Sequence, residues 1–280
     1  MSVNPVLAKA DPRAPGAIVF AGPDAATFLQ GQLTCDVLQL SDSGAMLGAC
    51  LTPQGRVLAI MRLIRRPEGV VALLPETLAA PVVAHLARYR LRAKLTIEDH
   101  TARFNFARAL GAGAAAAHRL LGTRSQVSLP GGRELWLDTA PLTQVTRANE
   151  DAWHAVAIGA GDADVSDRTS GEYVPQMLNL DLRDGISFSK GCYTGQEIVA
   201  RTQHLGRIKR RTFQYRASAG QLPPGTGLEL AGANVGTVLE SAALGTGSVA
   251  LAVINLSARD CALRAGALEL TPLALPYQVP

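Results

Sequence analysis

The chain has 280 residues, of which 48% are hydrophobic and 18% are charged, with a formal net charge of +4. This composition excludes an intrinsically disordered protein, and no apolar run reaches the roughly 20 residues of a membrane-spanning helix. The charge suits an anionic ligand or an acidic partner but is too small to indicate nucleic-acid binding. The first residues have neither the apolar core of a signal peptide nor the arginine content of a transit peptide, so we expect a cytoplasmic protein.

The first hundred residues alternate short apolar segments with two helical segments. Asp24 stands where the first helix would begin and is the expected N-cap. The letters TPQG at 52–55 are typical of a hairpin turn. Apolar patterning predicts strands at 17–21, 44–50, 56–64, 70–74 and 95–98, and helices at 25–31 and 75–89.

The rest of the chain repeats this mixture and then changes character. Residues 104–122 are rich in alanine with interrupting glycines, and we expect them to be partly helical; a strand at 134–138 and a helix at 149–158 follow. From residue 213 onward, glycine, proline and short apolar segments predict a compact all-β domain. Hairpins packed with helices favour an α+β protein over a doubly wound parallel sheet. Along the sequence we expect a first lobe at residues 1–100, a second lobe at 101–212 and a terminal domain at 213–280.

The most informative segment is SKGCYTGQEIVAR at 189–201. Thr194 and Glu197 have the spacing of a capping box, which predicts a helix from near Gly195. Cys192 would lie just before the positive end of this helix and two residues from Lys190, and both features favour a reactive thiolate. A small buried cysteine in a tight turn is an equally good interpretation of these residues alone.

The other three cysteines carry no comparable context. Cys35, Cys50 and Cys261 are far apart and form no C-x-x-C pair, so the spacing predicts no metal site and no private iron–sulfur site. We expect them to be small core residues. The chain also lacks a glycine-rich phosphate-binding loop after a strand, so nucleotide binding has no support.

Four segments together resemble the folate-binding YgfZ family: FLQGQLTCD at 28–36, LTPQGR at 51–56, QMLNLD at 176–181 and KGCYTGQEIVAR at 190–201. This family is related to the T-protein, the aminomethyltransferase of the glycine cleavage system. The resemblance implies a T-protein-like three-lobed fold, with two α+β lobes interleaved in sequence around a central channel and a small C-terminal β-barrel. It also implies binding of tetrahydrofolate, or of a one-carbon-substituted folate, and a role in the maturation or repair of iron–sulfur enzymes.

The same resemblance suggests roles for individual residues. Cys192, with Lys190 beside it, would be the reactive thiol, acting in redox exchange, in transient ligation of a cluster iron or in attack on a one-carbon adduct. Tyr193 would present its ring or hydroxyl to the folate channel, or be an ordinary core aromatic. The other candidate folate-binding residues are Gln32, Thr34, Asp36, Asn179, Gln196, Glu197 and Arg201. For Glu197 and Arg201 a capping box and an i,i+4 ion pair are the structural alternatives.

Three functions stay open at this point. The first is a tetrahydrofolate-binding accessory protein whose partners are iron–sulfur client or assembly proteins, with no membrane and no specific nucleic acid. The second is an aminomethyltransferase-like enzyme; against it, T-proteins carry a paired Asp segment after the hairpin, whereas QGR at 54–56 has no adjacent carboxylate for acid–base work. The third is a cysteine hydrolase that pairs Cys192 with His154 or His204.

Overall fold

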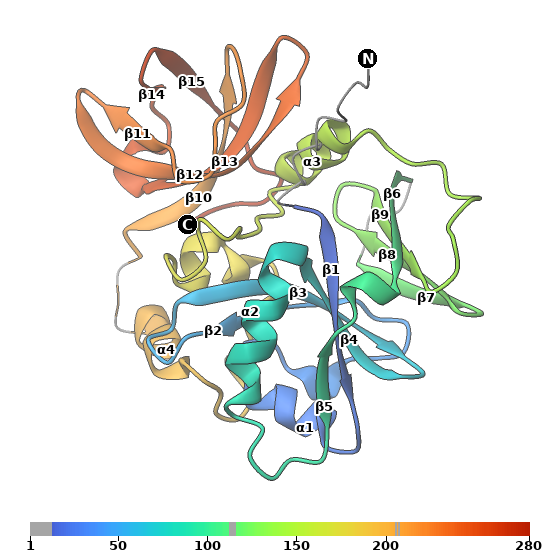
Figure 1. Cartoon of the computed structure of the whole chain (residues 1–280). Coiled ribbons are helices and arrows are strands. Elements are labelled where there is room, and N and C mark those ends of the chain that lie inside the picture. The colour runs from blue at the N-terminus through green and yellow to red at the C-terminus, as the bar shows by residue number, and fades with distance from the viewer. Residues whose placement is uncertain (1–12, 112–115, 205, 207) are drawn as a thin grey trace, which may run out of the picture.

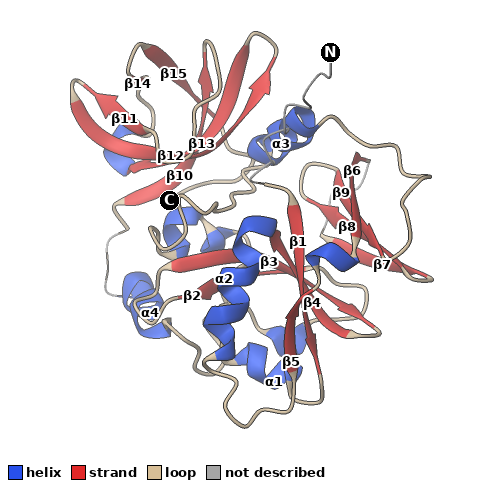
Figure 2. Cartoon of the chain, viewed as in Figure 1, coloured by secondary structure: helices blue, strands red, loops and turns tan. Residues whose placement is uncertain are grey.

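The computed structural model describes residues 13–111, 116–204, 206 and 208–280. Its strands form three separate antiparallel sheets, and α1, α2 and α4 lie beside the first of them (Figures 1 and 2). Within the described part of the chain, no helix has both the length and the hydrophobicity needed to span a membrane. The fold is α+β, as the sequence predicts.

The first sheet is buried on both faces. In β1, Ile18 and Phe20 point into the core beneath the helices, whereas Ala17 and Val19 point into the core shared with the second sheet. This opposite placement follows from the two-residue period of a strand. The sheet has the order β2-β3-β4-β1-β5, and its strands are β1 (Pro15–Ala21), β2 (Met46–Leu51), β3 (Val57–Arg66), β4 (Gly69–Pro75) and β5 (Thr96–Asp99).

Two helices cover one face of this sheet. They are α1 (Ala25–Gln30) and α2 (Glu76–Ala87), and a short 3-10 helix follows α1 at Val37–Gln39. Asp24 precedes α1 but does not cap it, contrary to the sequence prediction. Its carboxylate instead accepts a hydrogen bond from the backbone N–H of Lys94 at 2.7 Å. The side chain therefore ties two loops together instead of satisfying the helix start.

The second sheet replaces the partly helical segment expected at 104–122. This segment forms strands in its described part, while residues 112–115 lie outside the described residues. Ala107 and Ala109 are buried and pair with Trp136 and Glu134, so burial and strand pairing override the high intrinsic helix propensity of alanine. The sheet has the order β6-β9-β8-β7, with β6 (Asn105–Leu110), β7 (Ala117–Leu121), β8 (Arg124–Leu129) and β9 (Arg133–Asp138); a 3-10 helix at Thr101–Arg103 precedes it.

The third sheet is a closed barrel at the end of the chain, which confirms the predicted terminal β-barrel. Closure leaves no unpaired sheet edge. Tyr215, Leu228 and Ala250 belong to its buried core. Its strands are β10 (Arg210–Ala217), β11 (Gly227–Leu230), β12 (Ala233–Leu244), β13 (Gly247–Asn255), β14 (Leu263–Ala265) and β15 (Leu268–Leu273), with a 3-10 helix at Leu256–Ala258.

The segment between the second sheet and the barrel returns to the first sheet. It contains α3 (Glu150–Gly159), two 3-10 helices at Pro175–Leu178 and Leu180–Leu182, and α4 (Gln196–His204). Asn149 caps α3 by accepting a hydrogen bond from the N–H of Ala152, and α3 packs against β12. Leu180, Tyr193 and Val199 join the core of the first sheet. The KGCYTGQE segment thus packs on the first sheet although it follows the second sheet in sequence.

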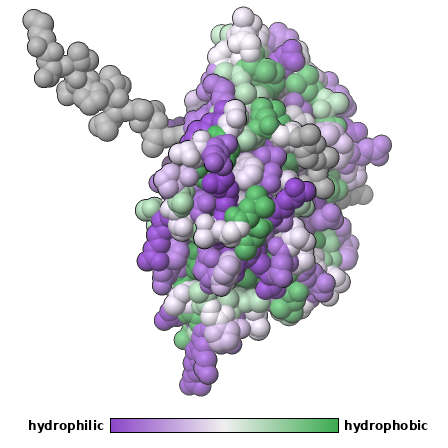
Figure 3. Space-filling model, turned by 90° about the vertical axis from the view of Figure 1, so that its right-hand side faces the viewer, coloured by the Kyte–Doolittle hydropathy of each residue, from purple (hydrophilic) through white to green (hydrophobic). Residues whose placement is uncertain are grey.

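The outer face of the second sheet is a mostly hydrophilic surface. Figure 3 shows this side of the molecule, where apolar side chains form small patches separated by polar ones. Exposed apolar residues of this sheet include Leu110 and Leu121. Scattered apolar side chains of this kind are normal for a protein surface and do not indicate a docking site.

A buried ion pair holds the barrel against the returning segment. Both terminal nitrogens of Arg211 donate to the carboxylate of Asp181, at 2.9 and 2.8 Å. The same guanidinium donates to the carbonyl oxygen of Gln176 and to Oδ1 of Asn179. Because both charged side chains are almost fully buried, each depends on the other to offset its loss of hydration.

Removing this guanidinium is expected to destabilise the fold. Arg211→Met leaves Asp181 buried without its counter-charge, so the free energy of unfolding should fall by about 3–5 kcal/mol in urea titrations. Arg210→Met is the matched control, because Arg210 is exposed and should change stability by less than about 0.5 kcal/mol. Equal effects of the two substitutions would contradict a structural role for the Arg211–Asp181 pair.

Candidate functional site

A cavity of about 670 Å³ lies where the first sheet, the second sheet, α3 and the barrel meet. Apolar side chains from each of these parts line it, including Ile60, Leu135, Trp153 and Leu239. Its volume is within the range of small-molecule sites, about 300–1,000 Å³. The cavity is therefore the first candidate for a ligand site.

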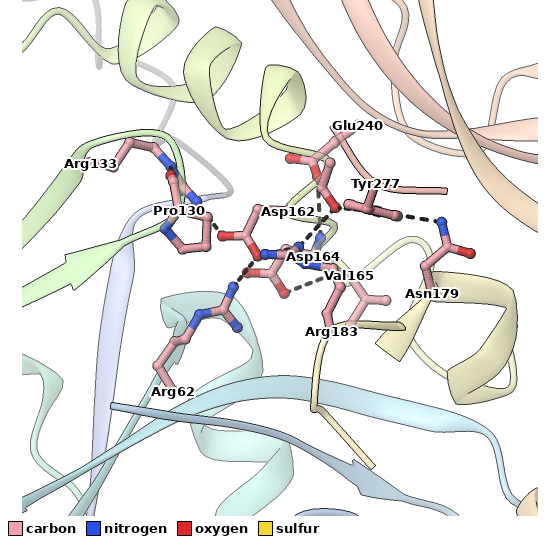
Figure 4. Close-up of polar contacts among 11 residues, drawn as sticks. Arg62, Pro130, Arg133, Asp162, Asp164, Val165, Asn179, Arg183, Glu240 and Tyr277 are labelled. Carbon is pink, nitrogen blue, oxygen red and sulfur yellow. Dashed lines mark hydrogen bonds and ion pairs between the residues drawn. The ribbon is translucent and has the colours of Figure 1, made fainter. Parts of the chain in front are cut away.

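One buried carboxylate organises a wall of this cavity. Asp162, in the loop after α3, forms ion pairs with Arg62 of β3, Arg133 of β9 and Arg183 of the returning segment (Figure 4). The Arg183 contact is 2.7 Å long. Burial alone would raise the pKa of Asp162, but the three guanidinium groups outweigh burial and hold the pKa well below its usual range. Asp162 is thus ionised at neutral pH and binds three parts of the fold together.

The C-terminal tail closes over this cluster. The hydroxyl of Tyr277 donates to the carbonyl oxygen of Gly161 at 2.9 Å, and the Arg183 guanidinium lies 5.9 Å from the centre of the Tyr277 ring. Nδ2 of Asn179 is 3.4 Å from the same hydroxyl (Figure 4). The tail therefore shields the ion cluster from water on this side.

A second pair of carboxyl groups lies beside the cluster in the cavity wall. The backbone N–H of Asp164 donates to Oε1 of Glu240, from β12, at 3.2 Å (Figure 4). Burial raises the pKa of Asp164 to about 7, and burial together with the nearby Asp164 raises the pKa of Glu240 to about 8. Near neutral pH the pair therefore retains about one proton and offers the cavity both a hydrogen-bond donor and acceptors.

Aromatic and basic side chains complete the lining. The guanidinium groups of Arg108 and Arg133 lie 5.1 and 4.5 Å from the ring centre of Trp153. Arg13 and Arg168 also line the cavity. The cavity thus combines an aromatic surface and acidic groups with positive charge, an arrangement suited to a flat polar ring that carries an anionic tail.

The KGCYTGQE segment forms a separate surface site. Cys192 is exposed, whereas Cys35 and Cys50 are buried as predicted and Cys261 is half-buried. Burial raises the pKa of Cys35 to about 11 and that of Cys50 to about 12, so their thiols stay protonated at neutral pH. Among the four cysteines, the surface position favours Cys192 for chemistry with a partner.

Lys190 is anchored to the FLQGQLTCD segment. Its Nζ donates to the carbonyl oxygens of Leu33 and Cys35, both at 2.7 Å, and lies 5.1 Å from the ring centre of Tyr193. Burial lowers its pKa, and the nearby Cys35 and Asp36 oppose this shift. These contacts give Lys190 a positioning role in the turn, because two of its three donors are committed to backbone carbonyls.

The predicted capping box does not form, because α4 begins one residue too late for it. The helix starts at Gln196, which puts Glu197 at its second position instead of the third that a capping box requires. Oγ1 of Thr194 donates to Oε1 of Gln32 at 3.1 Å, and the N–H of Tyr193 donates to Oε1 of Gln196 at 3.1 Å. In the described part of the chain, no ion pair joins Glu197 to Arg201, and both side chains are exposed.

A glycine and a tight turn hold the motif against the hairpin. Gly195 has φ +79°, and a Cβ there would lie 2.6 Å from the carbonyl oxygen of Thr52. Any other residue would therefore be strained and would clash with the hairpin turn. This contact brings the LTPQGR and KGCYTGQE segments together, although more than a hundred residues separate them.

The remaining predicted site residues have structural partners. Thr34 is fully buried, where its hydroxyl donates to the carbonyl oxygen of Gly185 and accepts from the N–H of Ala49. Asn179 is fully buried in a left-handed conformation, with its amide bound to Thr212 and Arg211. The Asp36 carboxylate accepts a hydrogen bond from Gln30. None of the residues that the sequence analysis names as catalytic or folate-binding lines the cavity; they are Gln32, Thr34, Asp36, Asn179, Lys190, Cys192, Tyr193, Gln196, Glu197 and Arg201.

Comparisons with known proteins decide the family. No family model matches the chain. The chain is 34% identical to the tRNA-modifying protein YgfZ of Colwellia psychrerythraea, over 71% of this chain and 68% of that protein. It is 33% identical to the proteins of the same name from Serratia proteamaculans, over 85% and 81% of the two chains, and from Klebsiella pneumoniae, over 92% and 89%. The chain belongs to the YgfZ family.

The fold of this YgfZ-family chain is that of an aminomethyltransferase. It is similar to the glycine cleavage system aminomethyltransferase T from Bartonella henselae, with a TM-score of 0.71 over 95% of this chain and 84% of that one. The sequence identity is 14%, so this similarity shows a shared fold and nothing more. The T-protein-like fold expected from the sequence is thereby confirmed.

The two histidines considered for a cysteine hydrolase lie elsewhere. His154 is on α3 in the cavity wall, and Cys192 does not line the cavity. His204 ends α4, where its ring is 6.5 Å from that of Phe188. The geometry gives a cysteine–histidine dyad no support.

Within the described residues, no cluster of three or more His, Cys, Asp or Glu side chains is arranged to hold a metal ion.

Sequence reasoning missed the residues that line the cavity. Asp162 and Asp164 flank an alanine just after a helix, and this alternation of carboxylates was the one local signal available. Their partners Arg62, Arg133 and Glu240 come from three different strands, so nothing in the local sequence links them.

Replacing the central carboxylate should test the ion cluster. Asp162→Asn leaves three guanidinium groups without their shared counter-charge, so the free energy of unfolding should fall by about 3–5 kcal/mol. Asp167→Asn changes an exposed carboxylate in the same loop and should have almost no effect on urea unfolding. A loss below about 1 kcal/mol in Asp162→Asn would mean that the cluster is not a major contributor.

The second carboxyl pair should make stability depend on pH. Asp164 and Glu240 have folded-state pKa values above their ordinary ones, 3.8 and 4.5, so the folded protein holds their protons more tightly than the unfolded chain does. Their contribution to the free energy of unfolding is therefore complete below about pH 4 and is lost as the pH rises to about 8. The double variant Asp164→Asn, Glu240→Gln should therefore be more stable than the wild type at about pH 8, and this advantage should shrink toward pH 5. Urea unfolding at both pH values measures it, and a constant difference would contradict the raised pKa values.

Proposed function

We propose that the cavity binds a reduced folate and that the protein supports the maturation or repair of iron–sulfur enzymes through Cys192. The observation that carries the first part is the lining of the cavity, where the Asp164–Glu240 pair and Trp153 share one space with several arginines. A folate has a flat ring with hydrogen-bond donors and acceptors, an aromatic spacer and a tail of glutamate carboxylates. The lining offers a complementary group for each of these parts.

The charge distribution in the cavity supports an anionic ligand. Arg13, Arg108 and Arg168 line it, and a guanidinium binds a carboxylate through paired, charge-assisted hydrogen bonds. The glutamate tail of a folate is such a partner. The fold shared with an aminomethyltransferase also places a folate among the first ligands to test.

The surface position of Cys192 supports a role in exchange with a protein partner. An exposed thiol is open to another protein, to a disulfide or to an iron atom of a cluster, whereas a thiol inside the cavity would act on the folate itself. Since Cys192 does not line the cavity, thiol chemistry and folate binding would occur at two distinct places. The relatives are named tRNA-modifying proteins, so an iron–sulfur enzyme that modifies tRNA is the client to test first.

An aminomethyltransferase-like activity is the second candidate. The sequence has no carboxylate next to the hairpin, yet the structure has carboxyl groups with pKa values of about 7 and 8 in the cavity wall. A group that titrates near the working pH is suited to acid–base catalysis. Formation of methylenetetrahydrofolate from an aminomethylated lipoyl carrier, lost in Asp164→Asn, would favour this activity over the accessory role.

Folate binding should quench the fluorescence of Trp153. Titration with 5-formyltetrahydrofolate should give saturable quenching in the wild type and in Trp136→Phe, because Trp136 does not line the cavity. Trp153→Phe should lose most of the signal, while calorimetry still detects binding. No saturable binding by either method would contradict the proposed folate site.

The thiol should be required for the cellular role and not for folate binding. Cys192→Ser should bind 5-formyltetrahydrofolate as the wild type does, because the residue lies outside the cavity. In cells that lack the native gene, the same variant should fail to restore the activity of iron–sulfur enzymes, whereas Cys261→Ser should restore it. Full restoration by Cys192→Ser would remove the thiol from the mechanism.

A further inference from the structure

We propose that the Asp164–Glu240 carboxyl pair recognises the ring end of the folate, by binding the 2-amino-4-oxopyrimidine edge of the pterin. This inference rests on the proposed function, in which the cavity binds a reduced folate. It adds the orientation of the ligand, the residues that read its ring and a dependence of affinity on pH.

The geometry leaves one oxygen of each carboxyl group available to a ligand. Oε1 of Glu240 accepts the backbone N–H of Asp164 at 3.2 Å, and Oδ1 of Asp164 accepts the N–H of Val165 at 2.8 Å. Among the described residues, the other oxygen of each group has no hydrogen-bond partner, and both residues line the cavity. The first of these contacts joins the Glu240 carboxylate to the backbone of Asp164, as Figure 4 shows, so the two residues belong to the same part of the cavity wall.

The charged neighbours of the pair are already engaged with other groups. Arg62 of β3 and Arg133 of β9 make ion pairs with Asp162, and Arg13 donates to the carbonyl oxygen of Ser241 beside Glu240. Burial is the largest effect and raises both pKa values, and Asp162 raises them further. Arg62 and Arg133 lower the pKa of Asp164, and Arg13 lowers that of Glu240. The other charged or titratable residues of the cavity lining are Arg108, His154, Asp167 and Arg168.

A pair that holds one proton is complementary to the pterin edge. That edge presents, in order, an acceptor at N1, donors at the 2-amino group and N3–H, and an acceptor at the 4-oxo group. A carboxylate accepts from the two adjacent donors, and a neighbouring carboxylic acid donates to the acceptor beside them. Two carboxylates would lack the donor, and two carboxylic acids would lack the charged acceptor.

The same pair orients the ligand, because it repels the glutamate tail. The carboxylates of the tail are favoured near Arg108 and Arg168 instead, so the ring lies at the Asp164–Glu240 wall and the tail at these two arginines. The cavity thus distinguishes the two ends of a folate by charge.

The test is calorimetric titration of 5-formyltetrahydrofolate between about pH 5 and pH 10. Wild-type affinity should be greatest at about pH 7–8 and should fall on both sides, by up to about tenfold per pH unit beyond the two pKa values. Asp164→Asn and Glu240→Gln each keep one carboxylate and gain a permanent amide donor, so each should bind within about threefold of the wild type near neutral pH. Each should lose the decline on the alkaline side.

Further variants separate the possible outcomes. The double amide variant has no carboxylate at the pair, so its affinity should fall by about 10- to 100-fold near neutral pH and lose its pH dependence. Asp167→Asn is the control, because it removes a cavity carboxylate outside the pair and should keep the wild-type profile. Melting curves of all variants show that they are folded.

A ligand without the ring gives an independent check. The fragment p-aminobenzoyl-glutamate lacks the pterin, so its binding should be weaker and equal in the wild type and the double variant. If wild-type protein binds 5-formyltetrahydrofolate and the double variant binds it equally well with the same profile, the inference is overturned and the folate site stands. If the wild type binds it at no pH, both the folate site and the inference are overturned.

Discussion

The ion cluster around Asp162 is the interaction on which the central architecture depends. One buried carboxylate compensates Arg62 of the first sheet, Arg133 of the second sheet and Arg183 of the returning segment. Three cations at one place would repel one another without it, so the cavity wall exists only with this charge in position. Because Arg62 and Arg133 form their ion pairs with Asp162, they do not neutralise the neighbouring Asp164 and Glu240. These two carboxyl groups therefore have raised pKa values and retain a proton near neutral pH.

The structure separates two sites that the motif alone suggested were one. The cavity lies among the sheets and α3, whereas Cys192 lies on the surface where α4 and the hairpin meet. Ile60 of the cavity wall and Tyr193 next to Cys192 both belong to the core of the first sheet.

Several elements were predictable because local patterning and tertiary burial agree. The apolar run of β1 predicts a strand, and burial of both its faces is the reason for that run. At 104–122 local patterning and tertiary burial disagree, because pairing of β6 with β9 and of β7 with β8 makes strands of an alanine-rich segment. The predicted capping box was wrong because α4 begins one residue later than the spacing of Thr194 and Glu197 requires. Of the candidate site, the sequence marked the exposed thiol and none of the cavity lining.

The sequence by itself determined the family, the α+β class, the terminal barrel and the segment that carries Cys192. These properties rest on contiguous residues or on short periodic patterns, which act locally. Only the tertiary structure decided which residues line the cavity. Asp162 meets Arg62 across 100 positions of the chain, and Asp164 meets Glu240 across 76. Burial and charge compensation depend on all of these groups together, so no stretch of sequence can specify them until the chain has folded.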